Sequence, residues 1–533
     1  MIWDWVIIGS GFGGSVSALR LAEKGYSVLV LEKGGRWVEE DFPRSNWNLK
    51  KWLWIPSIGF RGFFKMTFLR HITALTGVGV GGGSLVYANT LPTPAEGFFR
   101  ADGWGHLANW QEELEPHFQT ARRMLGANDN PLETAPDRAL RAMAERAGRA
   151  EHHRTAPVGV FFGEPGVTVP DPYHGGRGPE RTGCKFCGGC MTGCRYGSKN
   201  TLDKNYLWLA EKMGASIRAD TEVRWVKPQG PEGPARFRLE AREKTGTFRS
   251  RERSYEARNV IFAGGVFGTV QLLLRLKEDP AGLPDLSPRI GDRVRTNSEV
   301  LVGVTTQRRD LDLSEGIAIT SVFQTDDHSS VQPCRYSSGS GFFRVLTTPH
   351  APGRTFPKRL YNGLKRFLRS PARTLRALFV VDWARYTTAL LYMRTLEGYL
   401  RLSPKRGLFS RFSHGLRSKP GDGPLPTASI PEATQLAEEY AEETDGYVGS
   451  LLTEALFGIP TTAHILGGAC MGASEKDGVI DHQHRVFGYD GLYVIDGSAV
   501  SANPGVNPSL TITALAERAM SLIPARASVG DVE

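Results

Sequence analysis

His464 and Asn507 are two residues whose types could carry out chemistry on an alcohol. His464 lies in the segment TTAHILGGACMG, and Asn507 lies in the segment GVNPSLTITALAER. An imidazole can orient or accept a hydroxyl proton near neutral pH, and an asparagine amide can donate a hydrogen bond to an alcohol oxygen without carrying a charge. A lone histidine is more often a structural core residue, so this assignment depends on the motifs around it.

Four cysteines lie close together with regular spacing. Cys184, Cys187, Cys190 and Cys194 form the pattern C-x2-C-x2-C-x3-C, which is the spacing of the bacterial ferredoxin run. Arg195 stands where that pattern has proline, and no second set of cysteines follows. Three alternatives stay open: one [4Fe-4S] cluster, a zinc site, or free thiols in a structural loop.

The N-terminal residues predict a dinucleotide site. Residues 5–8 form an apolar run typical of a buried strand, and residues 15–23 have the pattern of an amphipathic helix. Between them stand Gly9, Gly11 and Gly14 in G-x-G-x-x-G spacing. The first glycine allows a tight turn, the second lets the backbone approach a pyrophosphate, and the third lets the helix pack on the strand.

An acidic residue at the end of the next strand narrows the choice of dinucleotide. Residues 27–31 form a second apolar run, which ends at Glu32. A carboxylate at this position can accept hydrogen bonds from both hydroxyls of an adenosine ribose and would repel a 2′-phosphate. We therefore expect FAD or NAD here, and not NADP.

Four later segments extend this pattern. Residues 77–92 (GVGVGGGSLVYANTLP) form a glycine-dense loop that would let backbone amides approach a flat ring or a phosphate. Residues 260–274 read as a strand, a glycine turn and an apolar helix, and residues 492–497 read as a strand that ends in Asp-Gly. Residues 505–518 open a helix with an Asn-Pro pair, and proline suits the first turn of a helix.

In this order, the segments resemble the glucose-methanol-choline (GMC) family of FAD oxidoreductases, and within it the cholesterol oxidase branch. The resemblance extends from Trp5 to about Arg518 and rests on the fingerprint, GVGGGSLV, AGGVFGT, HILGGACMG and DGSAVSANPGVNPSLTITALAERA. It implies that the dinucleotide is FAD and that His464 and Asn507 are the active-site pair. It also implies that the helix opening at Asn507 points toward the flavin pyrimidine, where its N-terminus would stabilise the anionic reduced ring.

The resemblance further implies an α/β fold, in which a Rossmann-like FAD-binding domain is interleaved with an α+β substrate domain. The FAD-binding domain is expected to comprise residues 1–36, 75–95, 198–298 and 460–527, and the substrate domain residues 37–74, 96–197 and 299–459. The residues expected to hold FAD are Gly9, Gly11, Phe12, Gly13, Gly14, Glu32, Gly83, Ser84, Tyr87, Asn89, Val223, Asp496, Gly497, Asn507 and Ser509.

One proton-transfer residue of the branch has no clear counterpart. Cholesterol oxidases use a glutamate to isomerise a double bond after oxidation, and the matching region here, HSSVQPCRYSSGSG, has Gln332 where the branch carries Glu. Glu315 is a candidate only by its proximity in sequence. The resemblance therefore leaves the isomerase activity in doubt.

The net charge of +9 comes from one segment. Residues 341–412 contain 15 lysines and arginines against only Asp382 and Glu397, interleaved with apolar and aromatic residues. We expect a basic amphipathic helix pair within residues 354–393, which could lie on an anionic membrane surface. A solvated basic face over an apolar core is the alternative, and nucleic acid is not expected because no binding motif accompanies the charge.

The start of the chain and its cysteine content predict a cytoplasmic protein, either free or peripheral at the inner membrane face. The sequence MIWDWVIIGSGFGG leaves no room for a secretory signal, and residues 378–393 are too short and too charged to span a bilayer. The expected activity is oxidation of a bulky hydrophobic alcohol, above all a 3β-hydroxysterol, with oxygen or a redox carrier as acceptor. Two alternatives are a flavin and iron-sulfur dehydrogenase of another lipophilic alcohol, and a non-catalytic membrane-associated flavoprotein.

Overall fold

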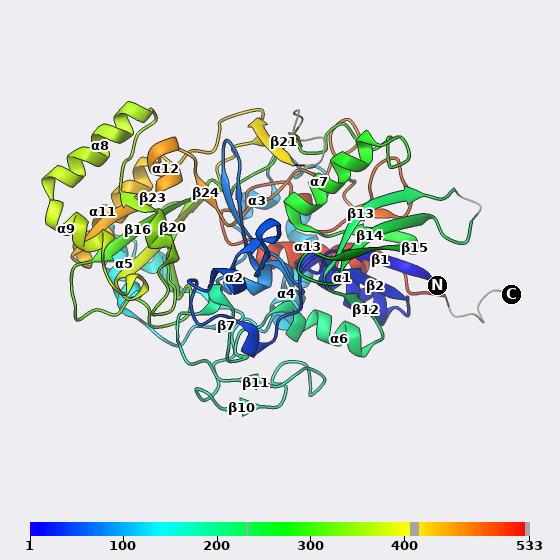
Figure 1. Ribbon diagram of the computed structural model, residues 1–533, viewed down its shortest axis with the longest axis horizontal. Coiled ribbons are helices and arrows are strands. Elements are labelled where there is room, and N and C mark those ends of the chain that lie inside the picture. Colours follow the sequence, from blue (N-terminus) through cyan, green and yellow to red (C-terminus); the bar gives the residue numbers. More distant parts are fainter. Residues whose placement is uncertain (231–232, 406–414, 528–533) are drawn as a thin grey trace.

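Seven strands from three separate stretches of chain form the nucleotide-binding sheet. The computed structural model describes residues 1–230, 233–405 and 415–527 (Figure 1). The sheet has the order β12-β2-β1-β15-β14-β13, and β25 pairs in parallel with the end of β15. Its strands are β1 (Ile2–Ile8), β2 (Val28–Leu31), β12 (Ser216–Arg218), β13 (Thr221–Pro228), β14 (Phe237–Lys244), β15 (Ser250–Phe262) and β25 (Leu492–Val494).

The buried half of this sheet is parallel. β1 pairs in parallel with β2 and β15, whereas β13, β14 and β15 form an antiparallel ribbon. The second half of β1 is buried on both sides, which is why it reads as a continuous apolar run rather than an alternating one. The carboxyl ends of β1, β2, β15 and β25 meet at one edge, where α/β folds bind their ligands.

Helices from the two chain ends pack together beside this sheet. α1 (Phe12–Glu23) packs against α13 (Ser509–Ser521) and α6 (Tyr206–Lys212). α13 also packs against α4 (Trp110–Met124), whose buried side chains belong to the same apolar core as β1 and β2. The sequence assigned α4 to the substrate domain, whereas in the structure its buried side chains join the core of the nucleotide-binding sheet. Its Trp110 and Phe118 face inward at helical spacing, but the sequence does not say which core they join.

A second sheet, entirely antiparallel, forms the other half of the molecule. Its order is β19-β23-β16-β20-β18-β17-β8. The strands are β8 (His153–Thr155), β16 (Val300–Thr306), β17 (Ser321–Gln324), β18 (Ser329–Cys334), β19 (Thr347–Pro349), β20 (Thr387–Arg394) and β23 (Gly446–Leu451). α5 (Ala135–Arg146) and α11 (Pro431–Glu443) cover one face of this sheet (Figure 1).

Alternate side chains of β16 lie on opposite faces of the second sheet. Val300, Val302 and Val304 of β16 pack into the core under the two helices, whereas Leu301 and Gly303 face a cavity on the opposite side. Successive side chains of a strand point to opposite faces, so this face can be specialised for a ligand without loss of the core.

The basic segment is only partly helical. α8 (Phe356–Arg369), α9 (Pro371–Leu378) and the short α10 (Trp383–Tyr386) are followed by β20, so the expected helix pair ends well before residue 393. β20 is a central strand between β16 and β18, where tertiary pairing overrides the local pattern. Residues 406–412 of the predicted segment lie outside the described residues. Among the described helices, none is both long and apolar enough to cross a bilayer.

Candidate active site

The turn after β1 has the geometry that a dinucleotide needs. Gly9 has a φ of +104°, and a Cβ on it would lie 2.3 Å from the carbonyl oxygen of Ala263. A Cβ on Gly14 would lie 2.2 Å from the carbonyl oxygen of Gly9, so helix and strand pack too closely for any side chain. Around Gly11 a Cβ would meet nothing within 4 Å. Its backbone therefore faces open space, as an approaching pyrophosphate requires.

Glu32 lies at the end of β2 with its carboxylate held in place. It accepts hydrogen bonds from the Ser10 amide (3.1 Å), the Ser10 hydroxyl (2.9 Å) and the Gly34 amide (3.0 Å). The residue is buried, yet it lines the cavity. A charged acceptor fixed beside the glycine turn is suited to a ribose diol.

Replacement of Glu32 by glutamine is expected to weaken FAD binding by about 10- to 100-fold, which corresponds to one lost charged hydrogen bond of roughly 1.5–3 kcal/mol. Glu222→Gln is the matched control, because Glu222 lines the same end of the cavity but is half exposed and paired with Arg224. Titration of apoprotein with FAD, followed by flavin fluorescence, measures both affinities. Equal losses in the two variants would contradict the assigned role of Glu32.

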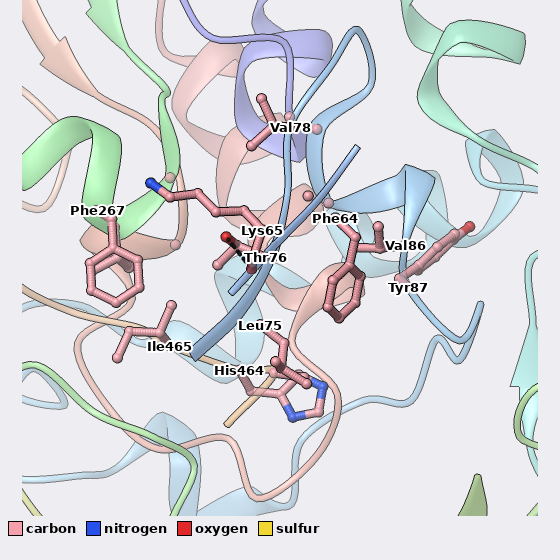
Figure 2. Close-up of a pocket in the computed structure, with 18 of the residues that line it drawn as sticks. Phe64, Lys65, Leu75, Thr76, Val78, Val86, Tyr87, Phe267, His464 and Ile465 are labelled. Carbon is pink, nitrogen blue, oxygen red and sulfur yellow. Dashed lines mark hydrogen bonds between the residues drawn. The ribbon is translucent and has the colours of Figure 1, made fainter. Parts of the chain in front are cut away.

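One cavity of about 880 Å³ connects this nucleotide end to the predicted catalytic pair. Most of the residues predicted to hold FAD line it, and they come from every part of the sequence pattern. These are Gly9, Gly11, Phe12, Gly13, Glu32, Gly83, Tyr87, Val223, Asp496, Gly497, Asn507 and Ser509. Figure 2 shows His464 among the lining side chains, with Leu75 beside its imidazole ring. The residues present thus fit an extended dinucleotide that reaches from Glu32 toward His464.

Three of the residues predicted to hold FAD do not line this cavity. Gly14 packs α1 against the turn, as described above. The Ser84 hydroxyl donates to the Gly81 carbonyl (2.7 Å) and accepts from the Leu202 amide (3.0 Å), so it stabilises the glycine-dense loop. Asn89 has a φ of 70°, and its buried side-chain amide has no partner among the described residues.

Asp496 joins two of the turns that form the cavity wall. Its carboxylate accepts bonds from the Ser498 amide (2.8 Å) and hydroxyl (2.5 Å), and from the Gly265 amide (2.8 Å) and Thr269 hydroxyl (2.5 Å). Burial raises the pKa of this carboxyl, and these donors oppose that effect. Because the side chain is committed to the protein, the backbone of Asp496 and Gly497 is what the cavity offers to a ligand.

His464, Asn507 and a glutamate that the sequence did not single out form one hydrogen-bonded chain. The Asn507 Nδ2 lies 3.3 Å from the His464 Nε2, and the His464 Nδ1 lies 2.5 Å from the Glu299 Oε2. The other Glu299 oxygen accepts from the Ala463 amide, and its side chain is fully buried. The Asn507 Oδ1 is buried and has no partner among the described residues. The pair therefore faces the cavity with one unused acceptor, the Asn507 Oδ1. Glu299 binds His464 and does not itself line the cavity.

Glu299 could have been suspected only from its local sequence. It follows Asn297 and Ser298, both in the left-handed region with φ of 57° and 45°, and it immediately precedes β16. Asn297 accepts from the Gly505 amide (2.9 Å) and donates to the Val506 carbonyl (3.0 Å). An Asn-Ser turn signal is visible in the sequence. The sequence does not show that this turn forms hydrogen bonds with the loop before Asn507, more than 200 residues away.

The end of the cavity beyond His464 is apolar. Its wall comes from the second sheet and from the segments before α8 and around α10, with lining residues Leu301, Ile319, Cys334, Tyr336, Phe343, Trp383, Ala389 and Leu391. Burial raises the pKa of the Cys334 thiol to about 12 and raises the pKa of the Tyr336 hydroxyl as well, so both are neutral near pH 7. This end therefore suits a large uncharged ligand.

Neither of the two candidates for an isomerising acid lies at this end as a carboxylate. Gln332 is buried on β18 with its Oε1 unpartnered among the described residues. Glu315 is exposed and does not line the cavity. Among the described lining residues, the carboxylates are Glu32, Glu222 and Asp496, all at the nucleotide part of the cavity.

The four clustered cysteines do not form a metal site in this structure. All are free thiols, and no three His, Cys, Asp or Glu side chains in the described ranges are placed to hold a metal ion. Burial raises the pKa of Cys184 and Cys187, and raises that of Cys190 to about 11, so without a metal these thiols are protonated near pH 7. The [4Fe-4S] cluster and the zinc site therefore stay predictions that no grouping of the described side chains supports.

The buried side chain of Lys199 links the cysteine loop to the glycine-dense loop. Its buried ammonium donates to the carbonyls of Leu85 (3.1 Å) and Cys190 (2.8 Å) and lies over the Tyr87 ring. Burial lowers the pKa of this lysine to about 8. The cysteine loop is thus fastened to the glycine-dense loop behind the cavity.

Comparison with known proteins agrees with this geometry. Residues 422–516 match the GMC oxidoreductase family, and residues 7–47 match the NAD(P)-binding Rossmann-like domain. The chain is 43% identical to a cholesterol oxidase from Acinetobacter baumannii, covering 98% of this chain and 95% of that protein. It is 45% identical to a cholesterol oxidase from Mycobacterium tuberculosis, covering 98% of this chain and 91% of that protein.

Solved structures give the same architecture. Pyridoxine 4-oxidase from Mesorbium loti superposes with a TM-score of 0.59 over 97% of this chain and 98% of that one, at 15% identity. This likeness, with the two sheets described above, confirms the predicted fold class. The identities over nearly the whole chain establish more than the fold: the protein belongs to the GMC oxidoreductase family and is an FAD-dependent alcohol oxidoreductase.

Proposed function

We propose that the protein oxidises the 3β-hydroxyl group of a sterol to a ketone and passes the electrons from FAD to oxygen. The observation that carries this proposal is one cavity that joins the nucleotide turn to the His464–Asn507 pair and continues into an apolar end. The two cholesterol oxidases at 43% and 45% identity support a bulky apolar alcohol and an oxidase reaction.

The residues of this chain divide the proton chemistry between them. When bound, FAD supplies the two-electron acceptor for the hydride on the carbinol carbon. Since Glu299 accepts the Nδ1 proton of His464, the Nε2 atom presents its lone pair and can take the hydroxyl proton. Asn507, 3.3 Å from that nitrogen, can donate to the alcohol oxygen and fix its orientation. The alcohol thereby loses one proton and one hydride and becomes a ketone.

The proposed activity is tested with purified holoenzyme and a panel of alcohols: a 3β-hydroxysterol, its 3α epimer, a long-chain primary alcohol and glucose. We expect oxygen uptake and equimolar peroxide with the 3β-hydroxysterol, much slower turnover of the 3α epimer, and none with glucose. Turnover of the primary alcohol in preference to the sterol would overturn the substrate assignment. Stoichiometric iron and acid-labile sulfide, with slow peroxide formation, would favour the flavin and iron-sulfur dehydrogenase instead.

The ketone is expected to leave the enzyme without migration of the neighbouring ring double bond. Isomerisation needs a group that removes and returns a proton on the substrate carbon skeleton, and none of the described residues at the apolar end is a carboxylate. Glu299 cannot serve, because both of its oxygens are occupied and it is fully buried. Ultraviolet spectra of the product should lack the absorption of a conjugated enone until base is added. Immediate appearance of that absorption during turnover would contradict this prediction.

A further inference from the structure

Helix α8 is oriented with its apolar side toward solvent. Leu360, Leu364 and Leu368 follow one another at intervals of four residues and therefore lie on one side of the helix. Leu364 is 54% exposed and Leu368 is 66% exposed, and among the residues of α8 only Arg359 is buried. A surface helix of a globular protein normally has the opposite arrangement, with its apolar side toward the core.

Arginines fix this orientation from the inner side. The Arg359 guanidinium donates to the carbonyls of Ala455 (3.0 Å) and Leu456 (3.0 Å), near the end of α12 (Leu452–Phe457). The last carbonyls of a helix have no partner within that helix, so a buried cation stabilises this end. On the same side of α8, Arg366 pairs with Glu438 of α11. α8 cannot turn its leucines inward without breaking these contacts, so their exposure is built into the fold.

Positive charge borders the exposed leucines. Residues 354–381 contain no aspartate or glutamate. Of the eight basic residues there, Arg359, Arg366 and Arg373 are engaged with the protein. The exposed cations that have no ion-pair partner within the described ranges are Arg354, Lys358, Lys365, Arg369 and Arg376. An apolar strip with a cationic border is complementary to an anionic lipid surface, because it presents alkyl groups to the acyl region and ammonium and guanidinium groups to the phosphates.

The apolar surface continues toward the substrate end of the cavity. After α9, Phe379 is 74% exposed and Val381 is 96% exposed. The Arg344 guanidinium donates to the Val380 carbonyl (2.6 Å), which joins this segment to the one that carries the exposed Val345. Two residues beyond Val381 stands Trp383, which lines the cavity.

Figure 1 shows α8 and α9 at the end of the molecule opposite the two termini. Both helices pack against β19, whose Thr347 lines the cavity, and α9 also packs against β23. The surface and the apolar end of the cavity are therefore built on the same strands.

We propose that the outward side of α8 and α9 with residues 379–381, here called the docking face, binds the surface of an anionic lipid bilayer. Docking would place the apolar end of the cavity next to the bilayer that holds a water-insoluble alcohol. This second statement rests on the proposed sterol oxidation, whereas docking itself does not. The interaction is peripheral: apolar side chains enter the interface and the cations meet lipid phosphates.

Vesicle flotation of the full holoenzyme without substrate tests docking directly. We expect binding to vesicles of phosphatidylcholine mixed with phosphatidylglycerol, and at least tenfold weaker binding to phosphatidylcholine alone or at high salt. The triple variant Leu360→Ser, Leu364→Ser and Leu368→Ser should lose at least tenfold in vesicle affinity and keep its activity on sterol presented in detergent micelles. Equal binding of wild type and variant, or no binding to either vesicle, would overturn the proposal.

A matched pair of phenylalanines tests whether vesicle binding depends on the docking face or on any exposed apolar side chain. Phe379 and Phe248 are both 74% exposed, but Phe248 lies in the turn between β14 and β15 of the nucleotide-binding sheet. Phe379→Ser should weaken vesicle binding and Phe248→Ser should not. If instead light scattering shows a dimer that the leucine triple variant abolishes, with no vesicle binding, the face is an interface between two copies and docking is wrong. If the wild type does not oxidise sterol presented in detergent micelles, the proposed function is wrong and the docking proposal is unaffected.

Discussion

Replacement of His464 by alanine is expected to slow flavin reduction by the alcohol by about 10²- to 10⁴-fold, the contribution typical of one positioned acid-base group. The variant should still bind FAD, because His464 lies at the other end of the cavity from Glu32 and the glycine turn. Anaerobic stopped-flow absorbance, with the FAD content of each preparation measured first, separates the two effects.

The control for His464 is Asn507→Ala, which removes the partner amide but leaves the imidazole held by Glu299. We expect a smaller loss than in His464→Ala, since orientation of the alcohol is weakened while the proton acceptor remains. If His464→Ala reduces its flavin at the wild-type rate with every alcohol, the proton acceptor lies elsewhere and the non-catalytic alternative returns.

Replacement of Glu299 by glutamine is expected to lower the rate of flavin reduction by roughly 10²-fold, although this side chain never meets the substrate. The carboxylate accepts two donors, the Ala463 amide and the His464 Nδ1–H. A glutamine has only one acceptor oxygen, so its NH2 group must face either the amide or the imidazole. The arrangement can then be satisfied only if His464 takes its other tautomer, in which Nε2 carries the proton and cannot accept one.

Glu454→Gln is the matched control for Glu299→Gln. Glu454 is also a buried carboxyl near this site, on α12, and it accepts a hydrogen bond from the Thr461 amide (3.1 Å). Burial raises the pKa of Glu454 to about 8, so near pH 7 it is mostly protonated and an amide resembles it closely. We expect kcat to fall in Glu299→Gln with KM and FAD content almost unchanged, and little change in Glu454→Gln. Similar losses in both variants would indicate a general effect of altering buried carboxyls.

The nucleotide half of the site could be predicted from the sequence because its information is local. The crowding at Gly9 and Gly14, the open space at Gly11 and the carboxylate at Glu32 all belong to one strand-turn-helix-strand unit. Most of these constraints are set within that unit, so spacing alone is informative, although Gly9 is crowded by Ala263, which follows β15.

The remaining features depend on contacts between distant segments. Glu299 reaches His464 only because β16 and the segment after β24 (Thr461–Thr462) come together in the fold. α4 reads as an ordinary amphipathic helix, and its partner α13 lies almost 400 residues later. The spacing of the four cysteines predicts a cluster, but no three metal-ligating side chains are grouped around one point in the described ranges. Spacing predicts which residues could share a site, and the backbone path decides whether they do.

Anaerobic mixing of the wild-type holoenzyme with a 3β-hydroxysterol tests whether this alcohol transfers its hydride to FAD, and it needs no assumption about the electron acceptor. We expect the oxidised flavin absorbance to disappear in a single turnover, at a rate that saturates with sterol, and one equivalent of the 3-ketone to form per FAD. An unchanged flavin spectrum with the sterol, in a preparation that is fully loaded with FAD and is reduced by another alcohol, would contradict it.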